Sequence, residues 1–235
     1  MITRHHVCLA CGGTLILYLP LVFANPSILP IIVAGVFIGV VLPDIQMTRP
    51  RHFTALSPVW FIIQIFRWIV LRFYILIYNN IFGLRPAAED KRLTHSLPGL
   101  FFITWIIILI FFLITGVFPS NPGLNYIRVF LTCIIIGLLF HFLEDTCTKK
   151  GLCPLYPLNE TYRIAGSIRP CNRDDLRIRK FHIMTGVGIV AIGLLFYTGI
   201  CPEYLHWLMS IGTLVVCTVI MLYYSEVKLT SNMLG

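Results

Sequence analysis

Charged side chains are scarce in this chain. Asp, Glu, Lys and Arg together make up 12% of its 235 residues, whereas roughly 25% is typical of soluble domains. The mean hydropathy is correspondingly high, at +0.85. The shortage of charge excludes an ordinary soluble domain and predicts an all-α integral membrane protein, because helices satisfy their own backbone hydrogen bonds in lipid.

Acidic residues are the rarer charged type, with 10 Asp and Glu against 18 Lys and Arg. We interpret the resulting net charge of +8 as a topology signal, because Lys and Arg near span ends mark the cytoplasmic side. No nucleic-acid partner is expected on this ground. The eight cysteines are scattered along the chain, so they predict no disulfide framework.

Long apolar runs, by contrast, are abundant. Six are long enough to cross a hydrocarbon core of roughly 30 Å. They lie near 7–24, 28–45, 97–118, 127–147, 181–200 and 205–224. A seventh run, 59–84, contains Arg67 and Arg72, each of which would cost about 2.5–3.5 kcal/mol at the centre of a span. This run is therefore predicted to form an interfacial or re-entrant helix whose arginines reach the head groups.

These runs predict one multi-pass domain, residues 1–235, in the inner or plasma membrane with both termini cytoplasmic. The opposite loops, 25–27, 119–126 and 201–204, contain no Lys or Arg. The basic loop 148–180 falls on the cytoplasmic side. A cleavable signal peptide is the alternative for the N-terminus. We favour an uncleaved first span, because cleavage would remove His6 and invert the charge balance.

A few ionisable side chains interrupt this apolar pattern. His141 and Asp145 close the fourth span four residues apart, so they lie on one helix face about one turn apart. On the predicted topology His6, Asp44 and His95 reach the same membrane face from the ends of the first three spans. Each has an ordinary explanation, such as a helix cap or a buried hydrogen bond. Their convergence nevertheless predicts a shared functional site.

Imidazoles combined with carboxylates suit Zn²⁺, Mn²⁺ or Fe²⁺ better than Ca²⁺, so we expect one or two such ions. A metal-bound water would ionise near pH 7, with Asp145 or Asp44, if not a ligand, as general base. The site's position at the level of the lipid head groups suggests that the substrate is a phosphoester, either a small molecule or linked to a lipid. Membrane lipids are the other expected partners. Arg163 or Arg169 could hold the phosphate of the substrate, although the basic loop is explained equally well by topology and attraction to anionic lipids.

The same residues carry a resemblance to a known family. The segments Gly39-Val-Val-Leu-Pro-Asp-Ile45, Leu93-Thr-His-Ser-Leu97 and 137–157 resemble the YdjM-type family. Its members are described as inner-membrane-associated, metal-dependent hydrolases, some of them LexA-binding. The family pattern is an N-terminal histidine, LPDxD, HRGxTHS and HxxxDxxTxxGxxxLxP. The resemblance covers roughly residues 5–158. It implies a polar site made of His6, Asp44, His95, His141 and Asp145.

The chain departs from that pattern in two places. Gln46 replaces the second acid of LPDxD, and Asp90-Lys-Arg92 replaces the first three residues of HRGxTHS. Asp90 could take over as ligand or general base, and His52 is a further candidate ligand. Two other functions stay open at this point. One is a non-catalytic membrane scaffold of the same fold, and the other is a transporter or ion-coupled permease in which the Asp/His set relays protons.

Overall fold

A computed structural model of the chain describes residues 3–46, 57–86, 90–118, 123–172 and 174–231. His52 lies outside these residues, and the side chains of Gln46 and Arg67 are likewise outside the description. The helices are α1 (Thr3–Ala24), α2 (Leu29–Val41), α3 (Ser57–Phe82), α4 (Leu97–Val117), α5 (Leu124–Thr146), α6 (Arg177–Tyr197) and α7 (His206–Tyr224). Two short strands, β1 (Tyr162–Ala165) and β2 (Lys228–Ser231), add a small sheet that the sequence did not predict.

Five helices in the described part of the chain are long and apolar enough to cross a membrane. They are Arg4–Ala24, Leu97–Val117, Leu124–Thr146, Arg177–Tyr197 and Glu203–Tyr224. The predicted second span, 28–45, forms the shorter helix α2. Its 13 residues extend about 20 Å at 1.5 Å per residue, which is less than the hydrocarbon thickness. Pro43 ends the helix because it lacks the N–H that would continue the hydrogen-bond ladder.

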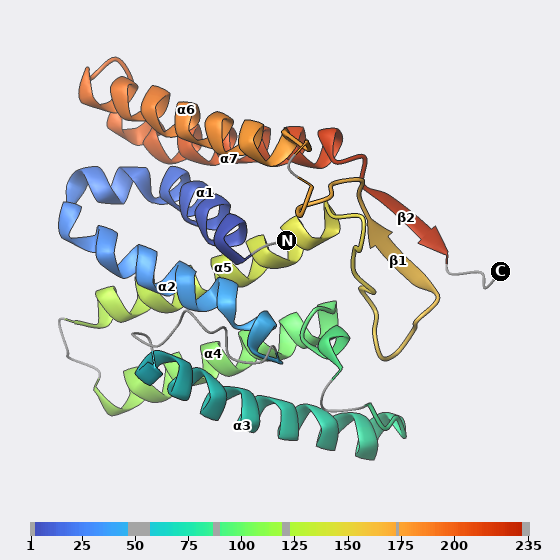
Figure 1. Cartoon of the computed structure of the whole chain (residues 1–235). Coiled ribbons are helices and arrows are strands. Elements are labelled where there is room, and N and C mark those ends of the chain that lie inside the picture. Colours follow the sequence, from blue (N-terminus) through green and yellow to red (C-terminus); the bar gives the residue numbers. More distant parts are fainter. Residues whose placement is uncertain (1–2, 47–56, 87–89, 119–122, 173, 232–235) are drawn as a thin grey trace.

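The arginine-containing run forms α3, a helix of 26 residues, and its Tyr74 packs edge-on against Phe102 in the first half of α4. Tyr74 and Tyr78 are buried with Leu93 and Tyr156 in one apolar cluster. Arg72 is exposed, and its guanidinium lies 4.4 Å from the ring centre of Trp68. In Figure 1, α3 extends in the same general direction as the long helices and does not lie across their ends.

Helix α2 packs directly along α5 through glycines. A Cβ atom at Gly35 would lie 2.6 Å from the carbonyl oxygen of Phe130, and one at Gly39 would overlap the carbonyl oxygen of Ile134. Gly137 of α5 faces α2 in the same way. Small residues four apart are typical of membrane helices whose backbones approach closely. This contact sets the C-terminal end of α2 beside the C-terminal half of α5.

The basic loop after α5 folds back on itself at the end of the bundle. Thr148 bridges to Ile168 and Leu152 to Ile164, while β1 pairs antiparallel with β2. Figure 1 shows this sheet at the same end of the helices as the N-terminus. The pairing therefore fixes the loop above the C-terminal end of α5.

Two side chains close this loop onto the C-terminal helices. The Arg177 guanidinium donates to Asp175 at 2.7 Å, to the Ser167 hydroxyl at 2.6 Å and to the Tyr224 carbonyl at 3.3 Å. Hydrogen bonds from Arg177 lower the pKa of Asp175 to about 2. The carboxylate is therefore charged at neutral pH, and it joins the loop to the ends of α6 and α7.

Candidate metal centre

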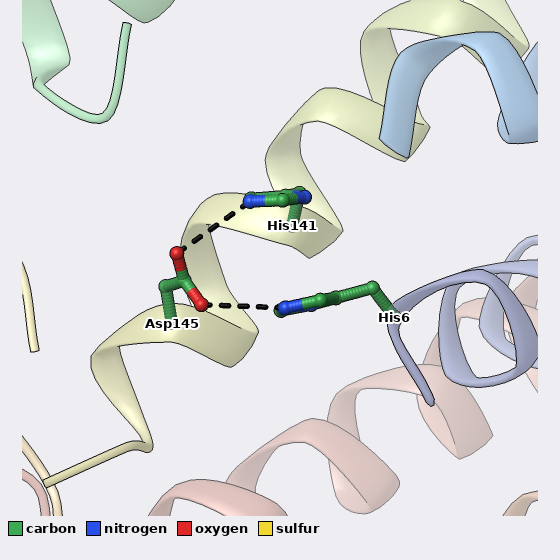
Figure 2. Close-up of side chains that lie close together, drawn as sticks. All are labelled: His6, His141 and Asp145. Carbon is green, nitrogen blue, oxygen red and sulfur yellow. Dashed lines mark ion pairs between the residues drawn. The ribbon is translucent and has the colours of Figure 1, made fainter. Parts of the chain in front are cut away.

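The structure brings all five predicted ligands together at one end of the helices. His141 and Asp145 occupy successive turns of α5, and His6 projects from the first turns of α1 (Figure 2). Asp44 comes from the 3-10 turn Pro43–Gln46 that follows α2. His95 lies in the turn just before α4. Four segments that are far apart in the sequence therefore share this site.

Three ligand atoms form a nearly regular triangle. His141 Nε2 lies 3.2 Å from His95 Nε2 and 3.5 Å from Asp145 Oδ2, and the third side measures 3.6 Å. Ligands bound tetrahedrally at roughly 2.0–2.1 Å from zinc stand about 3.3–3.4 Å apart. The triangle therefore has the dimensions of one face of a tetrahedral site. Asp44 Oδ1 lies 3.4 Å from His95 Nε2 and extends the donor set.

The other oxygen of Asp145 faces His6. His6 Nε2 lies 3.3 Å from Asp145 Oδ1, and the rings of His6 and His141 stack with their centres 4.3 Å apart. Figure 2 shows the Asp145 carboxylate beside the two stacked imidazoles, with one oxygen paired to each ring. Two overlapping groups could hold an ion. They are His6, His141 and Asp145, and Asp44, His95 and His141. The donor set of imidazole nitrogens and carboxylate oxygens fits a borderline divalent cation.

A backbone carbonyl fixes the orientation of His95. His95 Nδ1 lies 2.9 Å from the carbonyl oxygen of Lys91. Because a carbonyl can only accept, Nδ1 carries the hydrogen and the lone pair of Nε2 faces the cluster. The neighbouring Thr94 hydroxyl donates to the carbonyl oxygen of Pro43 at 2.9 Å. This bond joins the turn that carries Asp44 to the turn that carries His95.

Glu144 supports His6 from behind. Its Oε2 lies 2.9 Å from His6 Nδ1, and both side chains are only 1% exposed. Glu144 lies one residue before Asp145 in α5, so it points about 100° away from the helix face shared by His141 and Asp145. The structure shows that this direction faces α1. A carboxylate behind a ligating histidine commonly fixes the ring and strengthens its metal bond.

Glu144→Gln is therefore expected to weaken metal binding while preserving the fold. The amide has nearly the same shape as the carboxyl group but places an NH2 group where one of its oxygens stood, so it holds the Nδ1 side of His6 less firmly. Losses of about 10–100-fold are typical when such outer partners are changed. Competition with a chelator of known affinity measures the effect. Wild-type affinity in the variant would show that Glu144 does not act through His6.

Asp90 lies outside both ligand groups. Arg92 donates to it at 2.7 and 3.0 Å, and the Tyr156 hydroxyl donates at 2.8 Å. Burial alone would raise the pKa of Asp90, but these hydrogen bonds outweigh it and hold the pKa below its ordinary value. Arg92 also pairs with Glu160 at 2.9 Å. Asp90 and Arg92, which both depart from the family pattern, are thus partners that join their turn to the loop carrying Tyr156 and Glu160.

A pocket of about 610 Å³ opens over the cluster. His6, Asp44, His95 and Asp145 contribute to its wall. Arg163 and Arg169, the predicted substrate-binding residues, line the same pocket. The structure therefore brings these two arginines to the space in front of the ligands.

A family model described as YdjM inner membrane protein matches residues 1–228, and no curated protein or solved structure matches the chain. The match confirms the resemblance seen in the motifs and extends it through α6 and α7. The chain belongs to the YdjM inner membrane protein family.

Proposed function

We propose that this YdjM-family protein is a membrane-bound, metal-dependent hydrolase. The observation that carries the proposal is the triangle of His95, His141 and Asp145, whose sides match a tetrahedral ligand face. His6 and Asp44 complete the donor set. Zn²⁺, Mn²⁺ and Fe²⁺ are the ions that such a mixed set favours, and two overlapping groups allow one or two of them.

The residues divide the chemistry between them. A bound ion of this kind would lower the pKa of a coordinated water to about 7. A carboxylate oxygen of Asp44 or Asp145 that does not bind the metal accepts the proton of the attacking water. Lys91, through its carbonyl, and Glu144 hold the rings of His95 and His6 in place. Asp90 takes no part in this scheme, because Arg92 and Tyr156 occupy its carboxylate.

We place the site on the cytoplasmic side, with both termini there. The N-terminus and strand β1 of the basic loop lie at one end of the helices (Figure 1), and the cluster residues lie at the C-terminal end of α5 and just before α4. The opposite loops lack Lys and Arg. On this proposal α2 completes a sixth, shortened crossing, and α3 is re-entrant. Transport sites usually lie near the membrane midplane, whereas this cluster lies at helix ends, so its position favours hydrolysis.

Metal analysis of the detergent-purified protein tests the function. We expect about one or two equivalents of Zn, Mn or Fe per chain. We also expect ester hydrolysis that a chelator abolishes and that the same ion restores. A wild-type protein without metal, even after reconstitution, would contradict the proposal. Ion flux in liposomes would then separate a permease from a scaffold.

A further inference from the structure

We propose that the pocket over the cluster recognises a phosphate group with at least two negative charges, as in a phosphomonoester or a diphosphate. The inference rests on the proposed function, because the bond to be hydrolysed must lie at the cluster. Recognition itself depends on side chains that belong to neither metal-ligand group. The two ideas can therefore fail separately.

The pocket lining has a large excess of positive charge. Six cationic residues line it, namely Lys91, Arg92, Lys149, Lys150, Arg163 and Arg169. The carboxylates in its lining are Asp44 and Asp145, which are also candidate ligands. Arg92 is already paired with Asp90 and Glu160, but the other five cations form no ion pair with any described residue. Such a surplus of positive charge attracts a polyvalent anion and disfavours a neutral substrate.

The two free arginines stand on fixed backbone. Arg163 lies in β1 opposite Thr230, whose hydroxyl donates to the Arg163 carbonyl at 3.2 Å. The backbone N–H of Arg169 donates to Asp175 at 3.1 Å. Both guanidinium groups therefore project from anchored positions. A guanidinium can hold phosphate oxygens through two parallel hydrogen bonds.

A tight turn at Gly151 determines the positions of Lys149 and Lys150. The N–H of Lys149 donates to the Ile168 carbonyl at 2.9 Å, and Gly151 has a positive φ of 57°. A Cβ at Gly151 would overlap the carbonyl oxygen of Ile164. Only glycine permits this approach, and the approach sets Lys149 and Lys150 against the same pocket as Arg163.

The phosphate group that this pocket would recognise occurs both in lipid head groups and in soluble phosphate esters. Helix α4 begins two residues after His95, and its first turns expose Leu97 by 45% and Phe101 by 74%. An acyl chain can therefore lie along α4 while its head group enters the pocket. A soluble phosphate ester reaches the same cations from the aqueous side.

Hydrolysis of such a substrate needs water alone. The water oxygen forms a bond to phosphorus, and the bond between phosphorus and the ester oxygen breaks. One water proton passes through the carboxylate of Asp44 or Asp145 to the leaving oxygen. The products are an alcohol and inorganic phosphate, or two phosphates from a diphosphate.

Binding to the full chain in phosphatidylcholine nanodiscs tests the inference. The double variant Arg163→Gln/Arg169→Gln is compared with Arg179→Gln/Lys180→Gln, which removes two exposed charges outside the pocket lining. The probes are inorganic phosphate, glycerol 3-phosphate and dihexanoyl phosphatidic acid, with dihexanoyl phosphatidylcholine as the zwitterionic comparison. Calorimetry is run with and without metal.

We expect phosphate probes to bind the pocket variant at least about tenfold more weakly than wild type, with metal content unchanged. The control variant should lose less than about twofold. Tighter binding of phosphatidic acid than of glycerol 3-phosphate supports a lipid source, and equal binding supports a soluble one. Equal losses in both variants, or no loss in the pocket variant, would overturn the inference.

Measurements of metal content and of phosphate binding distinguish failure of the hydrolase proposal from failure of the phosphate-recognition proposal. A wild-type protein that holds metal but binds no phosphate probe leaves the hydrolase proposal standing and refutes the inference. A protein that binds phosphate through these arginines but holds no metal retains recognition and refutes the hydrolase proposal. Unchanged metal content in the pocket variant shows that it has folded.

Discussion

His141→Ala is expected to abolish metal binding altogether. His141 belongs to both ligand groups, and its Nε2 is one corner of the triangle with His95 and Asp145. Removal of this imidazole leaves neither group with three ligands. The loss should exceed the roughly 10–100-fold effect expected for an outer partner such as Glu144. Elemental analysis and chelator competition on the purified protein measure it, and hydrolysis should disappear with the metal.

His206→Ala is the matched control. This histidine lies at the start of α7, where it stacks on Phe196 with ring centres 3.8 Å apart, and it is in neither ligand group. We expect metal content equal to that of wild type. If His141→Ala kept its metal while eluting as folded protein, the cluster would not be the binding site.

Gly39→Ala is expected to destabilise the whole bundle. The added methyl group would overlap the carbonyl oxygen of Ile134, and backbone atoms cannot move aside as a flexible side chain can. Overpacking of a tight contact costs about 1–3 kcal/mol or more. Separation of α2 from α5 would also displace Asp44 from the cluster. The midpoint of thermal unfolding and the metal affinity should therefore fall together.

Gly116→Ala provides the comparison for this change. A Cβ at Gly116, in α4, meets nothing within 4 Å, so alanine there should be neutral or stabilising by about 0.5–1 kcal/mol. Thermal unfolding in one detergent compares the two variants directly. Equal midpoints would mean that α2 and α5 are further apart than the structure shows.

Hydropathy and charge were sufficient to predict the long helices and the meeting of the five candidate ligands. Helix length determines which runs can cross a membrane, and basic loops indicate which helix ends share a side, so the sequence was enough to group His6, His95 and His141. The shortness of α2 escaped this reasoning. The apolar run continues to Ile45, but Pro43 ends the helix before the run ends.

The roles of Glu144 and Asp90 depend on which elements become neighbours. Glu144 matters because α1 packs beside α5, and no periodicity within α5 reveals that neighbour. Asp90 had to be paired with Arg92, two residues away, and with Tyr156, which lies far along the chain. The family pattern showed that Asp90 and Arg92 were departures, but it did not show that they are partners. Only the packing of the two loops shows that the charges of Asp90 and Arg92 compensate each other.

The pairing of β1 with β2 has a consequence for the order in which the protein matures. All five cluster residues precede residue 146, so the cluster can assemble once α5 has emerged from the ribosome. Arg163 lacks its cross-strand neighbour until Lys228–Ser231 has been made. Synthesis thus leaves an interval in which an ion can enter an uncovered cluster, before the last strand fixes the basic loop above it. Under the proposed function, metal loading therefore precedes the completion of the phosphate-binding pocket.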